Sequence, residues 1–168
     1  MIIRLHIIGG AGSGKSYIAG RISEKYNVPH YDLDNIFWDN SVDEYGVKAP
    51  IIVRNKKLNE IVVQPSWIIE GVYFNWLEPS LALADKIFIL NTPLSMQEER
   101  IWSRHEKRKA GAIPSTKSET IKSVEQLIEW NRKYNQEFLP KFIRNNEYKE
   151  KMIQLENSEA IFSYLVNY

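Results

Sequence analysis

A glycine-rich stretch near the start of the chain constrains its fold more than any other feature. Residues 3–8 form an apolar run, which is typical of a buried strand, and residues 9–16 follow with the sequence GGAGSGKS. This fits the pattern G-x4-G-K-[ST], in which backbone N–H groups surround a phosphate, the lysine reaches the terminal phosphates of a nucleotide and the hydroxyl binds Mg2+. A helix that begins near Lys15 would add the positive end of its dipole. We therefore expect a nucleotide site with these members: Gly9, Gly10, Ala11, Gly12, Ser13, Gly14, Lys15, Ser16 and Tyr17.

Length and composition indicate an ordinary globular protein. The 168 residues suit one domain that spans residues 1–168, and the formal net charge of +1 argues against direct binding to nucleic acid. The chain has no cysteine, which excludes disulfides and thiolate metal sites. Met1 leads directly into the first predicted strand, which leaves no room for a signal peptide, and no apolar run is long enough to cross a membrane. We expect a cytoplasmic protein without membrane contact, either a monomer or a homodimer.

Strand and helix patterns alternate along the rest of the chain. Further strands are predicted at residues 28–34, 67–71, 86–90 and 151–155, and His6 is interpreted as a residue of the first strand rather than a ligand. Helices are predicted at 51–63, 80–84 and 94–109. Another helix should begin at Ser118 and Glu119 and be kinked or divided by Pro140, and a last one should be capped by Ser158. This alternation predicts an α/β three-layer sandwich with a parallel sheet.

Polar side chains follow several of the predicted strands. In open α/β sheets, ligands bind at the carboxyl ends of the strands, where this chain places Asp32, Asp34, Glu70 and Asn91. Acids there suit phosphoryl transfer, because one can hold Mg2+ and another can orient or deprotonate an attacking hydroxyl. Two structural alternatives remain open, namely that Asp34 caps the next helix and that Glu70 is a salt-bridged surface acid.

Three arginines recur along the predicted helix 94–109. Arg100, Arg104 and Arg108 are spaced i, i+4, i+8 and share one helix face. They form either a solvated face or part of a mobile lid, approximately residues 100–118, that neutralises charge on a transferred phosphoryl group. Gly111 and Pro114 break the helix and favour the lid. An aromatic cluster gives a similar choice between stacking on a flat ring and packing in the core; its members are Trp38, Tyr73, Phe74 and Trp76.

Several stretches in this order resemble a known group of proteins. Beside the glycine-rich loop, they are LDNIFW at 33–38, WIIEGVY at 67–73 and ADKIFILNTP at 84–93, followed by spaced arginines. The chain resembles the small bacterial P-loop proteins known as DNA topology modulation protein, FlaR-like, among the adenylate-kinase-like and shikimate-kinase-like kinases. It departs from them at Asn91, where relatives commonly have an acid, at Val72, where Asn is frequent, and at Leu94, where Arg is frequent.

The resemblance implies a five-stranded parallel sheet in the order 2-3-1-4-5, ATP and Mg2+ at the glycine-rich loop and a lid after the fourth strand. It also implies that Asp32 serves the metal and Asp34 the acceptor. We expect an ATP-dependent kinase that transfers the γ-phosphate to a hydroxyl or phosphate on a small acceptor, such as a nucleoside or nucleotide. The alternatives are a nucleotide-binding regulator without turnover and, less in keeping with the charge, a DNA-binding protein.

The expected roles divide into three groups. The catalytic residues are Lys15, Asp34, Arg100, Arg104 and Arg108. The acceptor-binding residues are Asp34, Trp38, Glu70, Gly71 and Tyr73. The metal ligands are Ser16 and Asp32.

Overall fold

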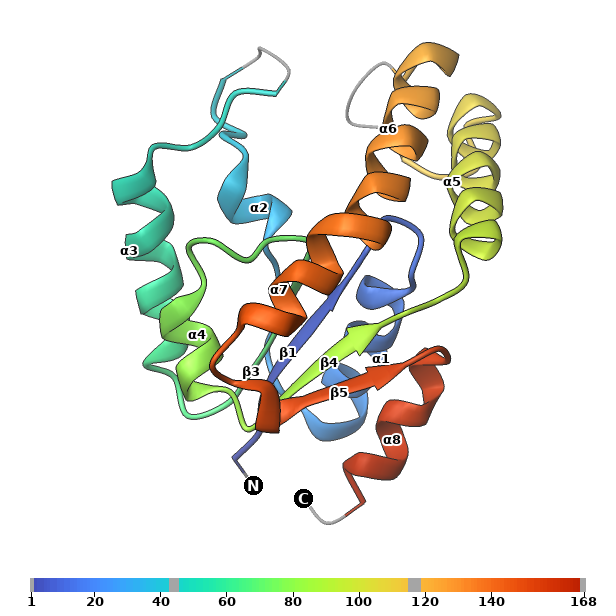
Figure 1. Ribbon diagram of the computed structural model, residues 1–168. Coiled ribbons are helices and arrows are strands. Elements are labelled where there is room, and N and C mark those ends of the chain that lie inside the picture. Colours follow the sequence, from blue (N-terminus) through green and yellow to red (C-terminus); the bar gives the residue numbers. More distant parts are fainter. Residues whose placement is uncertain (1, 43–45, 115–118, 167–168) are drawn as a thin grey trace.

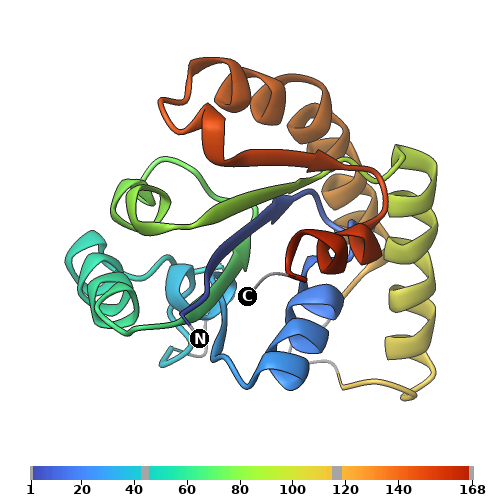
Figure 2. The same ribbon diagram turned by 90° about the horizontal axis from the view of Figure 1, so that it is seen from below.

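The computed structural model describes residues 2–42, 46–114 and 119–166 and contains a five-stranded, all-parallel sheet. The strand order is β2-β3-β1-β4-β5, with helices on both faces (Figures 1 and 2). The predicted α/β three-layer fold and the predicted strand order are therefore confirmed. The strands are β1 (Arg4–Gly9), β2 (His30–Asp32), β3 (Trp67–Gly71), β4 (Lys86–Leu90) and β5 (Met152–Leu155).

The helices connect these strands in the alternation that the sequence predicts. Predicted helices at 51–63 and 94–109 are confirmed to within a residue at each end. The helical segments are α1 (Lys15–Tyr26), α2 (Asp34–Phe37), α3 (Ile51–Val62), α4 (Glu78–Leu83), α5 (Leu94–Lys109), α6 (Ile121–Lys133), the π-turn η1 (Tyr134–Phe138), α7 (Leu139–Asn145), η2 (Lys149–Lys151), η3 (Ser158–Ala160) and α8 (Ile161–Tyr164).

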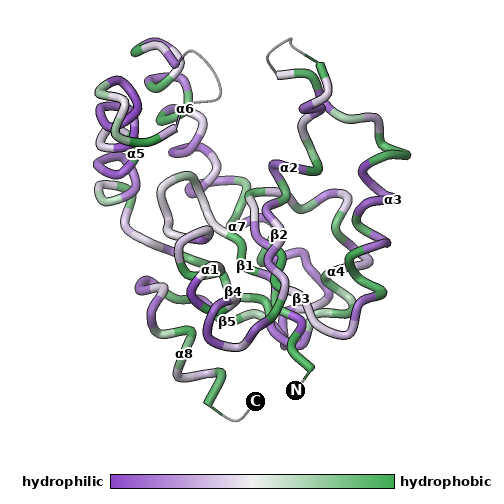
Figure 3. The backbone as a smooth tube through the Cα atoms, turned by 180° about the vertical axis from the view of Figure 1, so that it is seen from behind, coloured by the Kyte–Doolittle hydropathy of each residue, from purple (hydrophilic) through white to green (hydrophobic). Residues whose placement is uncertain are grey.

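Side chains of the central strand alternate between two apolar layers. Leu5 and Ile7 face α1 and α8, where they pack with Ile22 and Ile161, whereas Ile8 belongs to the layer under α3, α4 and η1. Each fully buried aliphatic side chain stabilises the fold by about 1.5–3 kcal/mol. Hydrophobic segments gather along β1 and β4, while α5 shows long hydrophilic stretches (Figure 3). In the described residues, no helix is both long and apolar enough to span a bilayer.

Local details differ from the predictions at three helix starts. The second strand ends at Asp32, and Asp34 begins α2, where its N–H donates to Asp32 Oδ1 at 2.8 Å. The last helical segment is capped by Asn157 rather than by Ser158, because Asn157 Oδ1 accepts from the Glu159 N–H. The α6 helix begins at residue 121 behind a Thr120 cap, and Ser118 lies outside the described residues.

The helix after the arginine segment is divided as predicted at Pro140. The π-turn η1 precedes α7. In this turn the Leu139 N–H donates to the Tyr134 carbonyl. Pro140 lies in the first turn of α7 and has no N–H to donate to the preceding turn, and the π-turn comes directly before it. The turn places Tyr134, which is 1% exposed, on the inner side of this helical segment.

The histidine of the central strand is a buried structural residue, as predicted. His6 Nε2 lies 2.8 Å from Ser80 Oγ on α4, and its ring meets Trp67 edge-on at 6.2 Å between centroids. Burial lowers the pKa of His6 to about 3. The unfolded chain, with a histidine pKa near 6.5, therefore binds one more proton than the folded chain between about pH 6.5 and pH 3.

This proton difference predicts a specific acid sensitivity. The free energy of unfolding should be unaffected by His6 above about pH 6.5 and fall by about 1.4 kcal/mol per pH unit below it. Urea unfolding of the parent chain and of His6→Leu between pH 7 and pH 5 measures this slope as a difference, because Asp32, whose pKa is raised to about 6, adds a slope of opposite sign to both proteins. His6→Leu should flatten it, with Ser80 Oγ still donating to the Leu77 carbonyl. An equal slope in His6→Leu would show that another group causes the acid sensitivity.

Candidate active site

The glycine-rich loop runs between β1 and α1 at the carboxyl edge of the sheet. Gly12 and Gly14 have φ angles of 74° and 95°, a region that favours glycine. A Cβ on Gly12 would also lie 2.5 Å from the Gln97 carbonyl oxygen, and one on Gly10 would lie 2.5 Å from Asn131 Oδ1. Conformation and close approach thus both require glycines here. Beyond the loop, Tyr17 projects outward and is 62% exposed.

Lys15 lies half-buried at the start of α1, within the field of three acids. Its Nζ donates to the Gly10 carbonyl oxygen at 2.8 Å. Burial lowers the pKa of Lys15, and the charges of Glu70, Asp34 and Asp32 oppose that shift. One cation therefore faces three acids at the carboxyl ends of two strands. This charge pattern suits a negatively charged ligand that carries its own bound cation.

The hydroxyl of Ser16 and the carboxylate of Glu70 form a pair of oxygens beside this lysine. Ser16 Oγ donates to Glu70 Oε1 at 2.5 Å, and His30 Nε2 lies 3.6 Å from the same oxygen. Burial raises the pKa of Glu70, but His30, Lys15 and Ser16 outweigh it and the pKa is lowered. Glu70, expected on the acceptor side, therefore sits as an ionised carboxylate next to Ser16, on the side of the predicted metal.

Asp32 lies beside Glu70 because β2 and β3 pair in parallel with these residues opposite each other. Burial raises the pKa of Asp32 to about 6, and the negative charge of Glu70 adds to the shift. The Asp34 N–H bond to Asp32 acts in the other direction. A cation between Asp32 and Glu70 would relieve the repulsion between the two carboxylates.

Asp34 is exposed at the start of α2 and is held by an aromatic residue of the β3–α4 connection. The Tyr73 hydroxyl donates to Asp34 Oδ1 at 2.5 Å, and the Tyr73 ring stacks on Phe37 with 4.4 Å between centroids. Burial and the charge of Asp34 both raise the pKa of Tyr73, so this hydroxyl keeps its proton. The second oxygen of Asp34 can therefore meet a ligand while the first is held in place.

The three arginines of α5 have different surroundings, although they share one face of the helix. Arg100 Nη1 donates to the Gly12 carbonyl at 3.1 Å, whereas Arg108 forms a 2.6 Å ion pair with Glu119, which also contacts His105 Nδ1 at 2.7 Å. Arg104 is half-buried with no hydrogen bond to any described residue. Burial is the main cause that lowers the pKa of Arg104, and the positive charge of Arg108 lowers it further. The negative charges of Glu119 and Asp34 act in the opposite direction.

The charge of Arg104 also reaches the site, since it lowers the pKa of Lys15. Arg100 contacts the backbone of the glycine-rich loop. The charge of Arg108 is neutralised by Glu119, which lies in the segment that leads into α6. The predicted lid includes residues 115–118, which lie outside the described residues, so its mobility stays a prediction.

A buried amide cluster ties α6 to the glycine-rich loop, and the sequence analysis missed it. Asn131 Oδ1 accepts from the Ala11 N–H at 2.7 Å, and its Nδ2 donates to the Ala11 carbonyl at 3.3 Å. Gln97 joins the cluster through a 2.8 Å bond from Asn131 Nδ2. One signal was present in the sequence, since Asn131 continues the apolar stripe of Val124 and Ile128 on α6. An asparagine at a core position requires polar partners.

Replacement of this asparagine should loosen the loop without removing any phosphate-binding group. Asn131→Ala leaves the Ala11 N–H without its partner and removes one of the hydrogen bonds that Gln97 Oε1 accepts, which costs about 1–3 kcal/mol in the free energy of unfolding. We expect urea unfolding to show this loss, and titration calorimetry to show ATP affinity lowered several-fold. The control is Gln126→Ala, an exposed position on the same helix. Equal effects of both variants would show that the cluster does not position the loop.

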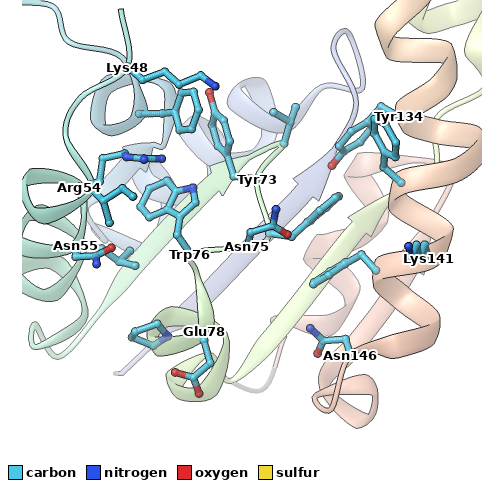
Figure 4. A pocket seen from close by; sticks show the side chains of 18 of the residues that line it. Lys48, Arg54, Asn55, Tyr73, Asn75, Trp76, Glu78, Tyr134, Lys141 and Asn146 are labelled. Atoms are coloured by element: carbon cyan, nitrogen blue, oxygen red, sulfur yellow. The ribbon is translucent and has the colours of Figure 1, made fainter.

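A cleft of about 1220 Å³ lies between the α2–α3 side of the molecule and the α6–η1–α7 segment. Tyr73 and Trp76 face Tyr134 and Lys141 across it (Figure 4). Trp38, expected in the acceptor site, does not line the cleft but lies edge-on against Phe37, with 4.8 Å between ring centroids. The described lining residues are mostly aromatic, amide or cationic: Phe37, Lys48, Ile51, Arg54, Asn55, Leu58, Asn59, Val72, Tyr73, Phe74, Asn75, Trp76, Glu78, Pro79, Trp130, Tyr134, Phe138, Lys141, Phe142, Asn145 and Asn146.

Gly71, also expected near the acceptor, occupies a packed position at the end of β3. A Cβ there would lie 2.9 Å from Leu33 Cβ. The residue is buried, and its lack of a side chain lets the β3 end approach the segment that carries Asp34. The structure thus gives Gly71 a packing reason, while its contact with an acceptor stays a prediction.

Comparison with solved structures finds proteins with a similar architecture. The shikimate kinase of Acinetobacter baumannii, solved with shikimate, superposes over 99% of this chain and 94% of its own, with a TM-score of 0.61 and 15% identity. The shikimate kinase of Bacteroides thetaiotaomicron covers 100% of both chains with a TM-score of 0.58 and 16% identity. The chain has the fold of the P-loop kinases. A gluconokinase from Sinorhizobium meliloti 1021 matches 91% of this chain and 81% of its own, with a TM-score of 0.53 and 13% identity.

Sequence comparison adds one relative. The uncharacterized protein YqaC of Bacillus subtilis strain 168 is 26% identical over 132 residues, which cover 78% of this chain and 72% of that protein. No family model matches the chain. The P-loop kinase fold is thus established by architecture.

The residues present in this P-loop kinase fold suit Mg2+ held mainly by a nucleotide. Ser16 and Glu70 supply hard oxygen atoms, and Asp32 lies beside them. Within the described ranges, no group of three His, Cys, Asp or Glu side chains is arranged to hold a metal. Mg2+ commonly keeps several waters and binds through one or two protein oxygens together with substrate phosphates, so this donor set fits.

Proposed function

We propose that this protein is an ATP-dependent phosphotransferase that transfers the γ-phosphoryl group to a hydroxyl or phosphate on a small acceptor. One observation carries the proposal, namely that the loop lysine, the Ser16–Glu70 pair and the Tyr73–Asp34 pair converge at one edge of the sheet. They separate into a phosphate end at α1 and an acceptor end at α2, with a large cleft on the acceptor side. The shikimate kinases and gluconokinase that share the fold support this assignment.

The residues of the chain would divide the reaction between them. The loop amides and Lys15 hold the phosphates, and Ser16 and Glu70, with Asp32, hold Mg2+ directly or through water. Bound Mg2+ would supply positive charge that offsets the negative charge of the phosphates. Arg104 provides a further cation, since its charge already couples to Asp34 and Lys15. These groups act by position and charge, which is what phosphoryl transfer requires.

For a hydroxyl acceptor, the bonds and protons balance as follows. The acceptor oxygen forms a bond to the γ-phosphorus, the bond from that phosphorus to the β–γ bridging oxygen breaks, and ADP leaves. The hydroxyl proton passes to Asp34, whose other oxygen is held by Tyr73. A phosphate acceptor carries no such proton, and Asp34 would then only orient it.

A second function has one specific observation in its favour. Asn91, at the end of β4, donates from Nδ2 to Gln154 Oε1 at 2.8 Å and so is engaged with the neighbouring strand β5. The proteins that this chain resembles commonly have a carboxylate at this strand end, and this chain has an amide there. The alternative is a nucleotide-binding regulator without acceptor turnover, in line with the resemblance to the FlaR-like topology modulation proteins.

Acceptor-dependent ADP release separates the two functions. The assay combines the protein with ATP and Mg2+ and a panel of nucleosides, nucleoside monophosphates and small hydroxy acids. A rate that rises with one acceptor and saturates supports the kinase. Tight ATP binding with only slow, acceptor-independent hydrolysis supports the regulator, and a steep loss of DNA affinity with salt would be needed to support direct DNA binding.

A further inference from the structure

One wall of the large cleft holds an arginine between aromatic rings. The Arg54 guanidinium carbon on α3 lies 4.9 Å from the centroid of the Phe37 ring and 5.7 Å from that of Trp76. Tyr73 continues this wall, stacked on Phe37 and bonded to Asp34. Cation–π contacts fix the position of a guanidinium while leaving its N–H groups free to bind a ligand.

The positive charge of this wall has no counter-ion among the described residues. No ion pair joins Arg54 to an acid of the described segments, and its Nε is buried without a hydrogen-bond partner there. Lys48, which is exposed, has its Nζ 5.7 Å from the same Phe37 centroid and also has no ion pair to a described acid, so only Arg54 is a half-buried cation here. A half-buried cation without a partner loses hydration, and an anion that bound there would restore its hydrogen bonds.

The opposite wall is a stack of rings with an unused hydroxyl. Phe74 stacks on Tyr134 at 5.5 Å and on Phe142 at 4.4 Å between centroids, with interplanar angles of 16° and 9°. The Tyr134 side chain is almost fully buried, yet its hydroxyl has no partner in the described part of the chain, and neither has Trp76 Nε1. In Figure 4 the Tyr134 hydroxyl points into the gap between the walls. A buried polar atom left unpaired destabilises the protein, so a ligand that pairs such an atom is favoured.

We propose that the acceptor is a flat aromatic compound that carries an anionic group. Its ring lies between the two aromatic walls, its anion binds Arg54 and its reacting group reaches Asp34 beside Tyr73. The Phe37–Tyr73 stack connects the two ends, since Arg54 lies against Phe37 and the Tyr73 hydroxyl bonds Asp34, which adjoins the cleft. The assignment of an acceptor rests on the proposed kinase function, whereas the binding of such a compound in the cleft does not.

Binding is therefore tested separately from turnover. Titration calorimetry with the full chain, with and without ATP and Mg2+, uses four kinds of probe: nucleoside 5′-monophosphates, the matching neutral nucleosides, 4-hydroxybenzoate, and the non-aromatic anions shikimate and gluconate. We expect at least one aromatic anion to bind ten or more times more tightly than its neutral counterpart and than either non-aromatic anion. Whether the nucleotide or 4-hydroxybenzoate binds then shows which kind of aromatic anion is recognised.

Variants locate the anion. Arg54→Gln should raise the dissociation constant of the best aromatic anion at least tenfold and leave its neutral counterpart within about twofold, while Arg54→Lys should recover part of the loss. Lys57→Gln, an exposed cation on the same helix, is the matched control and should change neither. Thermal unfolding of each variant shows that the fold is kept. Tyr134→Phe, which removes only the hydroxyl, should weaken binding several-fold.

The failures are distinguishable. Equal binding of a non-aromatic anion, no binding of any aromatic anion by a protein that binds ATP, or an unchanged affinity in Arg54→Gln would overturn the ligand class. Binding of an aromatic anion without stimulation of ADP release would uphold the ligand class and overturn the kinase function. Loss of ATP binding itself would overturn the proposed function alone.

Discussion

Lys15→Ala is expected to lower acceptor-stimulated ADP release by about a hundred- to a thousandfold, since it removes a charge that stabilises the transferred phosphoryl group. The lysine is the cation at the centre of the site, with Nζ bonded to the Gly10 carbonyl and coupled to Glu70, Asp34 and Asp32. Without it, three acids face the phosphates with no loop cation between them. ATP affinity should fall as well, which titration calorimetry measures.

The matched control is Lys25→Ala, which removes an exposed cation from the last turn of the same helix. It should leave turnover and ATP affinity near those of the parent chain. Circular dichroism at rising temperature shows whether each variant is folded. Normal nucleotide affinity and normal turnover in Lys15→Ala would mean that the phosphate site has been assigned to the wrong part of the molecule.

Asp34→Asn is expected to lower kcat by about a hundred- to ten-thousandfold when the acceptor is a hydroxyl, because the amide keeps the shape but cannot take the proton. The affinity for ATP should stay within a few-fold, as Asp34 lies at the acceptor end of the site. Tyr73→Phe keeps the ring stacked on Phe37 and removes only the hydroxyl that holds Asp34. Its effect should be smaller, about tenfold, and steady-state kinetics at saturating ATP measures both variants.

Asp39→Asn provides the comparison, since this acid follows α2 but bonds to Ser41 in the adjacent loop. It should leave kcat unchanged. A kcat that is unaffected in Asp34→Asn with a saturating hydroxyl acceptor would remove Asp34 from the chemistry. With a phosphate acceptor, a change confined to KM is the expected outcome, because that reaction has no hydroxyl proton to remove.

Short-range patterns in the sequence were sufficient for most of the fold. The apolar runs, the alternation with helices and the loop sequence GGAGSGKS predicted the parallel sheet, and the resemblance supplied its order. Helix α5 occupies residues 94–109, as its spacing indicates, and Pro140 follows a π-turn that divides the last long helix. Errors were local, at the β2 end and the Asn157 cap, where one or two residues with similar capping ability compete.

The site could be predicted only in part, because several of its contacts join residues that are remote along the chain. Asn131 binds Ala11 across 120 positions, and Ser16 bonds Glu70 across 54. The even spacing of the arginines could not show that Glu119 neutralises Arg108 while Arg104 stays without a hydrogen bond to a described residue. Such pairings depend on how helices dock on the sheet.

The sequence by itself determined the phosphate loop, the sheet and the acids at the strand ends, because backbone conformation and the periodicity of burial are local properties. Only the tertiary structure decided which oxygen each group faces and that Arg54 and Tyr134 line one cleft. The reason is physical: the partner of a polar group, and the space left between two helices, are fixed only when distant segments pack together and exclude water.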